Sequence, residues 1–480
     1  MALREGWELV CGLEVHAELN TNTKIFCACA NNFGDEPNTN ICPVCLGLPG
    51  SLPVLNERVV ELAMLVGLAL HCTVKPSIFH RKNYFYPDMP KDYQVSQYDE
   101  PINADGWLVL PDGTRIEVER AHLEEDTGKT QHMGSSGRIH GADYSLVDYN
   151  RAGVPLLEIV SRPDIRTPDQ AKAYVSELRA ILVATGASDG KMEEGSMRVD
   201  ANVSVRRPGE PYGTRAEIKN LNSLRSLVRA MEYEANRQIG LLESGERVVQ
   251  ETRHWNEEEG RTSSMRSKEE AMDYRYFPEP DLVPIAPSEQ WVEAVRATLP
   301  QLPAERRGRL SEATKGDLAP GSEMIVTVVN LDLDALVLGA VDAGADARRA
   351  ISRAANDLAA AGVSADAVGV GAFADLLLME GDGRLTATQA KTVLGEMIAR
   401  GPAADPQAIA KERGFEVMAG AAAMTLVDTL IAKHPVEFER LRGGDAKVTG
   451  FFVGQAMQLS DKKADGRVVT ALLRERAGLA

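Results

Sequence analysis

Two segments that lie far apart in the chain, 7–19 and 197–206, alternate apolar and polar residues. A period of two is typical of a β-strand whose successive side chains point to opposite faces of a sheet. In the first segment, Glu14, His16 and Glu18 share the polar face and therefore project side by side. The pattern predicts a sheet with one apolar face and one strongly charged face.

The second alternating segment continues into a predicted hairpin. A Pro-Gly turn signal at 208–209 separates it from another strand-like stretch at 214–219. Arg198 and Asp200 lie on the polar face of the first strand, and Lys219 lies on that of the second. Two interpretations stay open: an ordinary solvated sheet face, or a floor that grips a polar, charged ligand.

The composition of the chain changes near residue 290. The part before it is rich in Gly, Pro, Asn and Tyr, whereas the part after it is rich in Ala, Leu, Arg, Asp and Glu. Strands and tight turns are expected in the first part and helices in the second. We predict an α+β fold with a large mixed β-sheet domain at 1–290, an all-α domain at 291–405 and a small helical tail domain at 406–480.

The net charge of the 480-residue chain is -17. This charge argues against a protein that coats nucleic acid with a uniformly basic surface, but it allows local basic patches. The apolar runs are shorter than the ~18 residues that a membrane span requires. The first six residues contain no apolar signal core. We therefore expect a cytoplasmic protein that does not enter a membrane.

All six cysteines occur before residue 73, and four of them form two close pairs. The pairs are Cys27-Ala-Cys29 and Cys42-Pro-Val-Cys45. Four thiolates at such spacing suit a tetrahedral zinc ion, and a site filled by four protein ligands would be structural rather than catalytic. The alternatives are four reduced structural thiols or a redox-active Cys-x-x-Cys pair, for which no thioredoxin-like βαβ pattern is present.

Carboxylates form the other candidate metal site. An acidic cluster occupies 124–126, and Glu158 interrupts the apolar stretch 154–160. A lone carboxylate in an apolar strand is uncommon unless it is paired or bound to a metal ion. Together with Glu14 and His16, these acids would suit Mg²⁺ or Mn²⁺. The alternative is a set of separate surface acids and one hydrogen-bonded histidine.

Aromatic residues make up only 5% of the chain, yet five of them lie between 84 and 98, next to Lys82. A second group lies at 274–277 around Arg275. Loops that carry aromatic rings and cations can stack bases and hold phosphates. The alternative is a pair of small aromatic clusters that pack beneath loops.

Several longer motifs occur in a defined order along the chain. They are Gly-Leu-Glu-Val-His-Ala-Glu-Leu at 12–19, Arg-Lys-Asn-Tyr-Phe-Tyr-Pro at 81–87, Ser-Leu-Val-Asp-Tyr-Asn-Arg at 145–151, Lys-Met-Glu-Glu-Gly-Ser at 191–196 and Asp-Tyr-Arg-Tyr-Phe-Pro-Glu-Pro-Asp at 273–281. In this order they closely resemble the B-subunit family of the bacterial aspartyl/glutamyl-tRNA(Asn/Gln) amidotransferases. The resemblance covers essentially the whole chain.

The resemblance implies a cradle-like N-terminal domain and a three-subunit enzyme. In that family the B subunit uses ATP to phosphorylate the side-chain carboxylate of Glu or Asp that is misacylated onto tRNA. Ammonia, released from glutamine by an amidase A subunit, then displaces the phosphate. A small C subunit wraps the interface. The helical tail is expected to contact the body of the tRNA.

The resemblance also implies roles for particular residues. The Mg²⁺ ligands would be Glu14, His16, Glu125 and Glu158. Contacts to ATP would come from Arg198, Asp200 and Lys219, with Lys82 at the phosphate or acyl end. Structural Zn²⁺ would be held by Cys27, Cys29, Cys42 and Cys45.

Two other functions compete with this ligase. One is a zinc-containing RNA-binding scaffold without chemistry of its own, which would have no need of Glu158 inside an apolar strand. The other is a free-standing phosphotransferase, which would be active without a partner amidase.

Overall fold

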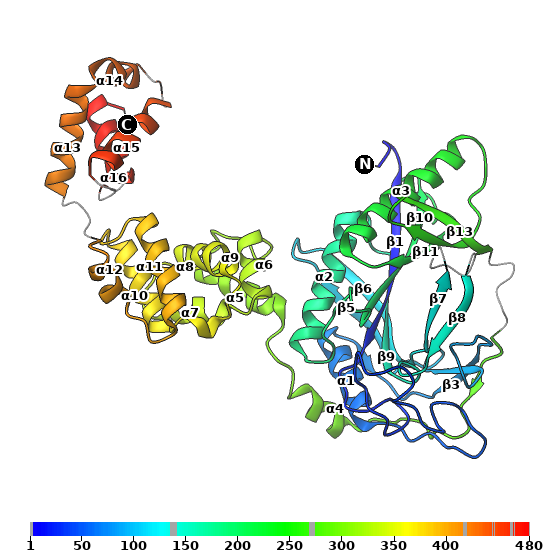
Figure 1. Cartoon of the computed structure of the whole chain (residues 1–480). Coiled ribbons are helices and arrows are strands. Elements are labelled where there is room, and N and C mark those ends of the chain that lie inside the picture. The colour runs from blue at the N-terminus through cyan, green and yellow to red at the C-terminus, as the bar shows by residue number, and fades with distance from the viewer. Residues whose placement is uncertain are drawn as a thin grey trace. The chain divides into compact units, whose positions relative to one another are not determined.

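The computed structural model describes residues 3–134, 142–267, 274–415, 420–443, 445, 447–460, 464 and 466–479 (Figure 1). The chain divides into two compact units, Met1–Pro303 and Ala304–Ala480. The first unit contains the strands, and the second is helical. The α+β fold that the composition predicts is therefore confirmed. The predicted domain limits at 290 and 405 stay a prediction.

Fourteen strands are found in the described part of the first unit. Their bounds are β1 (Glu8–Glu18), β2 (Thr73–Val74), β3 (His80–Asn83), β4 (Tyr93–Ser96), β5 (Asn103–Val109), β6 (Arg115–Glu125), β7 (Lys129–Gly134), β8 (Ala142–Asp148), β9 (Pro155–Ser161), β10 (Met197–Arg206), β11 (Ala216–Leu221), β12 (Glu251–Asn256), β13 (Arg261–Ser267) and β14 (Phe277–Pro278).

One large mixed sheet organises the unit. Its strand order is β13-β12-β11-β10-β1-β9-β6-β4-β3-β14, with β5 paired to β6 and β2 paired to β5. The neighbours along this path are antiparallel except for β11 and β12, which are parallel. The ribbon of β7 and β8 forms a separate sheet. Strands β1, β9 and β6 lie side by side at the centre, although they come from distant parts of the sequence.

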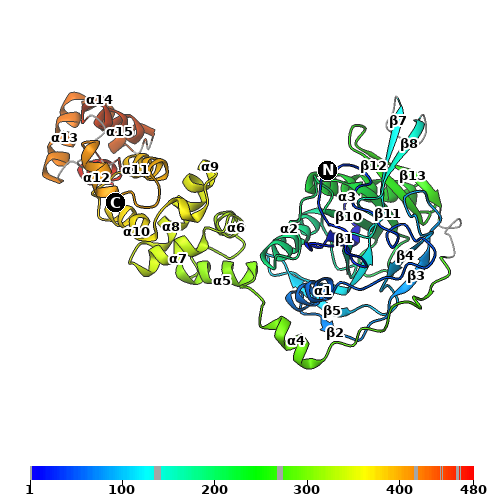
Figure 2. The ribbon, with the colours of Figure 1, turned by 60° about the horizontal axis from the view of Figure 1, so that its bottom comes forward.

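Helices cover one face of this sheet. They are α1 (Glu57–Ala69), α2 (Pro168–Ala184) and α3 (Leu224–Glu243), which lie along the same side in Figure 1 and Figure 2. Each begins at a residue whose side chain accepts a hydrogen bond from the first turn, Asn56, Thr167 or Ser223. Such caps satisfy backbone N–H groups that have no partner within the helix. The sheet's other face is left for polar side chains.

The alternation of apolar and polar residues determines which face of the sheet packs against the helices. In β1 the apolar set from Leu9 to Ala17 is almost fully buried, and in β10 the same holds from Met197 to Val205. Most of the residues between them are only partly buried, including Glu14 and His16 in β1 and Arg198 and Asp200 in β10, whereas Val10 and Ser204 are buried. Burial of apolar surface against the helices therefore fixes the register and forces the charged residues of both strands onto the opposite face.

The chain leaves the first unit through helix α4 (Glu289–Arg296). Trp291 and Val292 of this helix, with Leu299 and Leu302 after it, pack against the core of the first unit. The compact unit therefore extends to Pro303, past the composition change near residue 290.

The second unit contains two separate hydrophobic clusters, one from Leu310 to Ala410 and one from Val427 to Leu473. Its helices are α5 (Pro303–Ala313), α6 (Glu323–Asn330), α7 (Asp334–Asp342), α8 (Ala347–Arg353), η2 (Ala354–Leu358), α9 (Ala359–Ala361), η3 (Ala365–Ala367), α10 (Val370–Gly381), α11 (Ala387–Arg400), α12 (Pro406–Glu412), α13 (Gly420–Lys433), α14 (Pro435–Arg442), α15 (Lys447–Leu459) and α16 (Gly466–Ala477).

Within the described residues, no single helix has the length and apolar character needed to cross a bilayer. Helices α6 and α7 reach that apolar length only when taken together, and they are bent by 108° at the break between them. Their residues Ile325, Val328, Leu336 and Val337 are buried in the first cluster of the second unit.

Candidate active site and metal centre

Three adjacent strands bring an acid and two imidazoles together. His16 on β1 is paired in register with Glu158 on β9, and Glu158 is paired in register with His122 on β6. Residues that are directly opposite on neighbouring strands project on the same face of a sheet. The three side chains therefore form a row across the polar face.

The row closes into a compact cluster with Glu124, two residues after His122. His16 Nε2 lies 3.5 Å from Glu158 Oε2 and 3.6 Å from Glu124 Oε1. One ligand atom from each of these three residues lies within 4.8 Å of the others. Two carboxylates and one imidazole that converge in this way can hold a divalent cation, with further positions left for water or substrate oxygens.

The charges within the cluster are strongly coupled. Burial alone would lower the pKa of His16, but its hydrogen bond to Glu158 and the charge of Glu124 raise it to about 9. Burial and the charge of Glu158 raise the pKa of Glu124 to about 7. Burial opposes ionisation of Glu158, yet its contacts with His122 and His16 hold its pKa well below the usual range. Burial lowers the pKa of His122 to about 4, so this imidazole is neutral.

A second group of acids lies beside the first on the same face. Glu14, Asp200 and Glu217 come from β1, β10 and β11, and their carboxylate oxygens lie within 4.8 Å of one another. Lys219 Nζ lies 2.5 Å from Asp200 Oδ2 and 2.9 Å from Glu217 Oε1. Asn202 donates a hydrogen bond of 2.8 Å to Glu14 Oε1. Burial and the neighbouring carboxylates raise the pKa of Glu14.

Cations also face the cluster. The Arg198 guanidinium on β10 lies 2.9 Å from Asp126 Oδ2, which fixes its position. Lys82 Nζ on β3 lies 4.9 Å from the centre of the Tyr274 ring. The charge of Lys82 lowers the pKa of Glu124, so this ammonium acts on the cluster. The structure therefore gathers Glu14, Asp200 and Lys219, together with Arg198 and Lys82, around the acid and imidazole cluster.

Of the four predicted Mg²⁺ ligands, His16 and Glu158 lie in this cluster and Glu14 lies in the neighbouring group of acids, whereas Glu125 lies in neither. It lies on the opposite face of β6, where its Oε1 accepts hydrogen bonds from Lys91 Nζ at 2.5 Å and from the Val95 N–H at 2.9 Å. A shift of one residue along a strand moves a side chain to the other face. Glu124, the residue before it, therefore occupies the place that the sequence analysis gives to Glu125.

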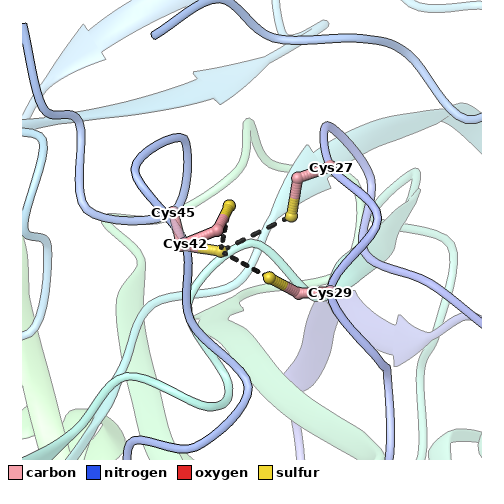
Figure 3. Close-up of side chains that lie close together, drawn as sticks. All are labelled: Cys27, Cys29, Cys42 and Cys45. Atoms are coloured by element: carbon pink, nitrogen blue, oxygen red, sulfur yellow. Dashed lines mark hydrogen bonds between the residues drawn. The ribbon is translucent and has the colours of Figure 1, made fainter.

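The four predicted zinc-binding cysteines converge at one point, as Figure 3 shows. The Cys45 sulfur lies 3.5 Å from that of Cys27 and 3.7 Å from those of Cys29 and Cys42. Four sulfurs at ~2.3 Å from a tetrahedral zinc ion would be separated by ~3.8 Å. The geometry of the thiols thus fits a four-coordinate metal ion.

A fully buried lysine lies next to these cysteines. Lys24 Nζ lies 3.6 Å from Cys45 Sγ, and it donates hydrogen bonds to the carbonyl oxygens of Asn40 at 2.8 Å and Tyr149 at 3.2 Å. The hydrogen bond from Cys27 and the charge of Lys24 lower the pKa of Cys45 to about 4. Cys45 is therefore a thiolate, the form that binds metal ions.

Comparison with known families decides how these features belong together. Residues 9–293 match the GatB/GatE catalytic domain, and residues 337–476 match the GatB domain. This chain belongs to the GatB family. The candidate site and the cysteine cluster both lie within the stretch that matches the family's catalytic domain.

Individual members of the GatB family are similar over nearly their whole length. The B subunit of the aspartyl/glutamyl-tRNA(Asn/Gln) amidotransferase of Frankia casuarinae is 48% identical over 491 residues, which cover 98% of this chain and 96% of the relative. The B subunits of the same name from Salinispora tropica and Corynebacterium glutamicum are also 48% identical. Each match covers 98% of this chain, with 97% and 98% of the respective relative.

Within this GatB-family chain, His122 and Lys24 were not among the residues predicted for the candidate sites, and Glu124 was included only as a member of the acidic cluster 124–126. A signal for His122 and Glu124 was present, because Ala121 and Leu123 are apolar and the residues between and after them therefore belong to the polar face. Reading that alternation through to the end of the strand selects Glu124 over Glu125. No local pattern marks Lys24, whose burial depends on the fold of the cysteine loops.

Proposed function

We propose that this chain is the B subunit of an aspartyl/glutamyl-tRNA(Asn/Gln) amidotransferase. In this proposal it uses ATP to phosphorylate the side-chain carboxylate of Glu or Asp that is misacylated onto tRNA, and ammonia from a partner amidase subunit then forms the amide. The observation that carries the proposal is the convergence of His16, Glu124 and Glu158 on three adjacent strands inside the stretch that matches the GatB/GatE catalytic domain. The names of the similar proteins support the same activity.

The proposed reaction has two steps. A carboxylate oxygen of the aminoacyl group attacks the γ-phosphorus of ATP, the bond between that phosphorus and the bridging oxygen breaks, and ADP leaves. Ammonia then attacks the side-chain carbonyl carbon of this acyl phosphate. The bond from that carbon to the phosphate oxygen breaks, and phosphate leaves with one of the ammonia protons. Neither step needs an amidase nucleophile in this chain.

His16, Glu124 and Glu158 are the proposed ligands of Mg²⁺, in place of the set that included Glu125. Glu14 lies next to them and is a candidate for a further contact. When bound, the cation would neutralise charge on the phosphate and on the acceptor carboxylate. Glu158, with its low pKa, supplies a carboxylate that stays ionised.

The cations of the polar face have complementary roles in this proposal. Arg198 and Lys219 are held by carboxylates, at 2.9 Å from Asp126 and 2.5 Å from Asp200, so they are oriented before a ligand arrives. Oriented cations stabilise the charge that develops on a transferred phosphoryl group. Lys82 is proposed to contact the phosphate or the acyl end, because it acts on the cluster from β3, whereas the other two cations lie on β10 and β11.

Zn²⁺ is the proposed ion at Cys27, Cys29, Cys42 and Cys45, where it would stabilise the loop and take no part in the reaction.

The amidase A subunit, a small C subunit and misacylated tRNA are the proposed partners. The tail is proposed to contact the body of the tRNA. Of its basic residues, Lys462 and Lys463 lie outside the described residues.

The test is an amidation assay with Glu-tRNA(Gln) and Asp-tRNA(Asn), in the presence and absence of the partner subunits. We expect amide formation that requires ATP, and phosphate release that requires the misacylated tRNA. Glu158→Gln should lower both by more than about a hundredfold, since it removes a ligand charge rather than an outer contact. Glu258→Gln, at an exposed position on the same unit, is the matched control.

The same assay separates the competing functions. A scaffold without chemistry predicts full turnover in Glu158→Gln, and a free-standing phosphotransferase predicts phosphate release without tRNA or amidase. Either result would contradict the proposal. The buried cluster of carboxylates and imidazoles favours the enzyme, because buried charge carries a large cost that a scaffold has no reason to retain.

A further inference from the structure

His122 is a buried imidazole for which the fold provides no hydrogen bond. Its side chain is completely shielded from solvent, and within the described part of the chain neither ring nitrogen has a hydrogen-bond partner. A buried polar group without a partner destabilises a protein by about 1–3 kcal/mol. An imidazole is therefore retained here in spite of its cost, which points to a role in the site that it faces.

The ring lies against Glu158. His122 Nε2 is 3.5 Å from Glu158 Oε2, and His16 Nε2 is 3.5 Å from the same oxygen. The carboxylate of Glu158 thus lies between two imidazoles that come from the strands on either side of it. His16 is also 3.6 Å from Glu124, whereas no described ion-pair contact joins His122 to another acid.

Aromatic and cationic side chains keep the ring in place. Tyr98 meets the His122 ring edge-on, with 6.2 Å between centroids, and stacks on Tyr276 at 5.5 Å. The Arg120 guanidinium lies 4.7 Å from the centre of the Tyr98 ring. These groups restrict rotation of the imidazole and exclude water from its nitrogens. An N–H that points toward Glu158 would be held there by packing.

We propose that His122 is a positioning residue for Glu158. In this structure its Nε2 is 3.5 Å from Oε2 without hydrogen-bond geometry, and it donates its hydrogen to that oxygen when Glu158 binds a cation. Carboxylates that bind metal ions are themselves hydrogen-bonded by outer residues, and the loss of such a residue typically costs 10–100-fold in metal affinity. This inference rests on the proposed function, because it requires that Glu158 bind a cation. It adds a residue that acts through Glu158 and does not touch the substrate.

The experiment measures Mn²⁺ binding to the assembled complex by electron paramagnetic resonance. His122→Leu removes the donor and should weaken Mn²⁺ binding about 10–100-fold. His122→Gln keeps an N–H donor on a side chain of comparable reach and should stay within about threefold of wild type. His80→Leu replaces another buried imidazole of the same sheet and should also stay within about threefold.

A second measurement distinguishes positioning from a purely structural role. In amidation assays, His122→Leu should require about 10–100-fold more Mg²⁺ for half-maximal activity but recover kcat at saturating Mg²⁺. A structural defect would lower kcat at every Mg²⁺ concentration. If His122→Leu does not fold, His122→Gln decides alone: binding within threefold of wild type supports the proposal, and weaker binding overturns it.

Three further outcomes of the Mn²⁺ binding experiment would overturn part of the proposal. If wild type binds Mn²⁺ and His122→Leu binds it as tightly, the positioning role is overturned and the proposed metal site stands. If His122→Gln is as weak as His122→Leu, the hydrogen bond is not the cause and the proposal is overturned. If wild type binds no Mn²⁺, the proposed metal site itself fails.

Discussion

The strands place Glu124 and Glu125 on opposite faces of the sheet, and this difference makes a sharp prediction about two adjacent carboxylates. Glu125 forms a buried ion pair with Lys91, in which the two side chains are 3% and 9% exposed. Glu125→Gln removes the charge but keeps the shape and an oxygen that can accept from the Val95 N–H. The expected result is loss of folding stability without loss of metal binding.

The magnitude follows from the charge that is left behind. Breaking a buried ion pair by removing one partner costs about 3–5 kcal/mol, because the other charge stays buried without compensation. The compact unit ends at residue 303, and an unfolding entropy of about 2.1 cal/mol/K per residue gives about 0.6 kcal/mol/K for it. We therefore expect Glu125→Gln to lower the Tm of this unit by about 5–8 °C.

Thermal and urea unfolding followed by circular dichroism measures the change, and Mn²⁺ titration of the folded protein measures binding. Glu125→Gln should bind Mn²⁺ within about threefold of wild type, because Glu125 makes no contact with the cluster. Glu124→Gln is the matched variant. It should lose more than about tenfold in Mn²⁺ affinity. It should also unfold close to the wild-type temperature. An unchanged Tm together with lost binding in Glu125→Gln would refute this reasoning.

The remaining predictions concern the two metal sites. Purified protein should contain about one zinc ion per chain, and Cys45→Ser should reduce that content to background by elemental analysis, because Cys45 is the central sulfur of the cluster. Mn²⁺ affinity should rise as the pH increases from 7 toward 9, because the His16 imidazole is protonated below a pKa of about 9 and must release a proton before Nε2 can bind the ion. His16 should contribute at most about a tenfold rise in affinity per pH unit. Isothermal titration at several pH values should show a smaller dependence on pH for His16→Gln. Lys24→Met should release zinc to a chelator at least several-fold faster than wild type, since it removes the ammonium that lies 3.6 Å from Cys45 Sγ; an unchanged rate would show that the lysine has no effect on the ion.

Local patterns in the sequence predict much of the first unit. The alternation at 7–19 and 197–206 agrees with β1 and β10, and α4 begins after Ser288, whose side chain accepts a hydrogen bond from the Trp291 N–H. These features depend on neighbouring residues, either through the period of a strand or through a single side-chain hydrogen bond. For the same reason, the two faces of the sheet can be assigned before the fold is known.

Long-range pairing is what the sequence leaves open. Nothing local to His16 indicates that Glu158 will be its cross-strand neighbour, since strand order depends on how the apolar faces pack together. His122 is an example, because alternation places it on the polar face but its pairing with Glu158 becomes visible only when β6 is placed beside β9. The alternation of apolar and polar residues in β6 distinguishes Glu124 from Glu125. In a run of three consecutive acids, however, the pattern does not stand out, and the acid that faces the site is easily misassigned.

Lys24 joins the cysteine cluster to the segment that leads into β9. The same ammonium that approaches Cys45 donates to the carbonyl of Tyr149, and a nearby backbone bond of 3.0 Å joins the Ile25 N–H to the Gly153 carbonyl. Strand β9 begins at Pro155 and carries Glu158. A metal ion bound by the thiols would therefore stabilise the start of the strand that carries Glu158, a proposed Mg²⁺ ligand. The two metal centres would then be thermodynamically linked, so that removing the ion from the cysteine cluster with a chelator should weaken cation binding at Glu158.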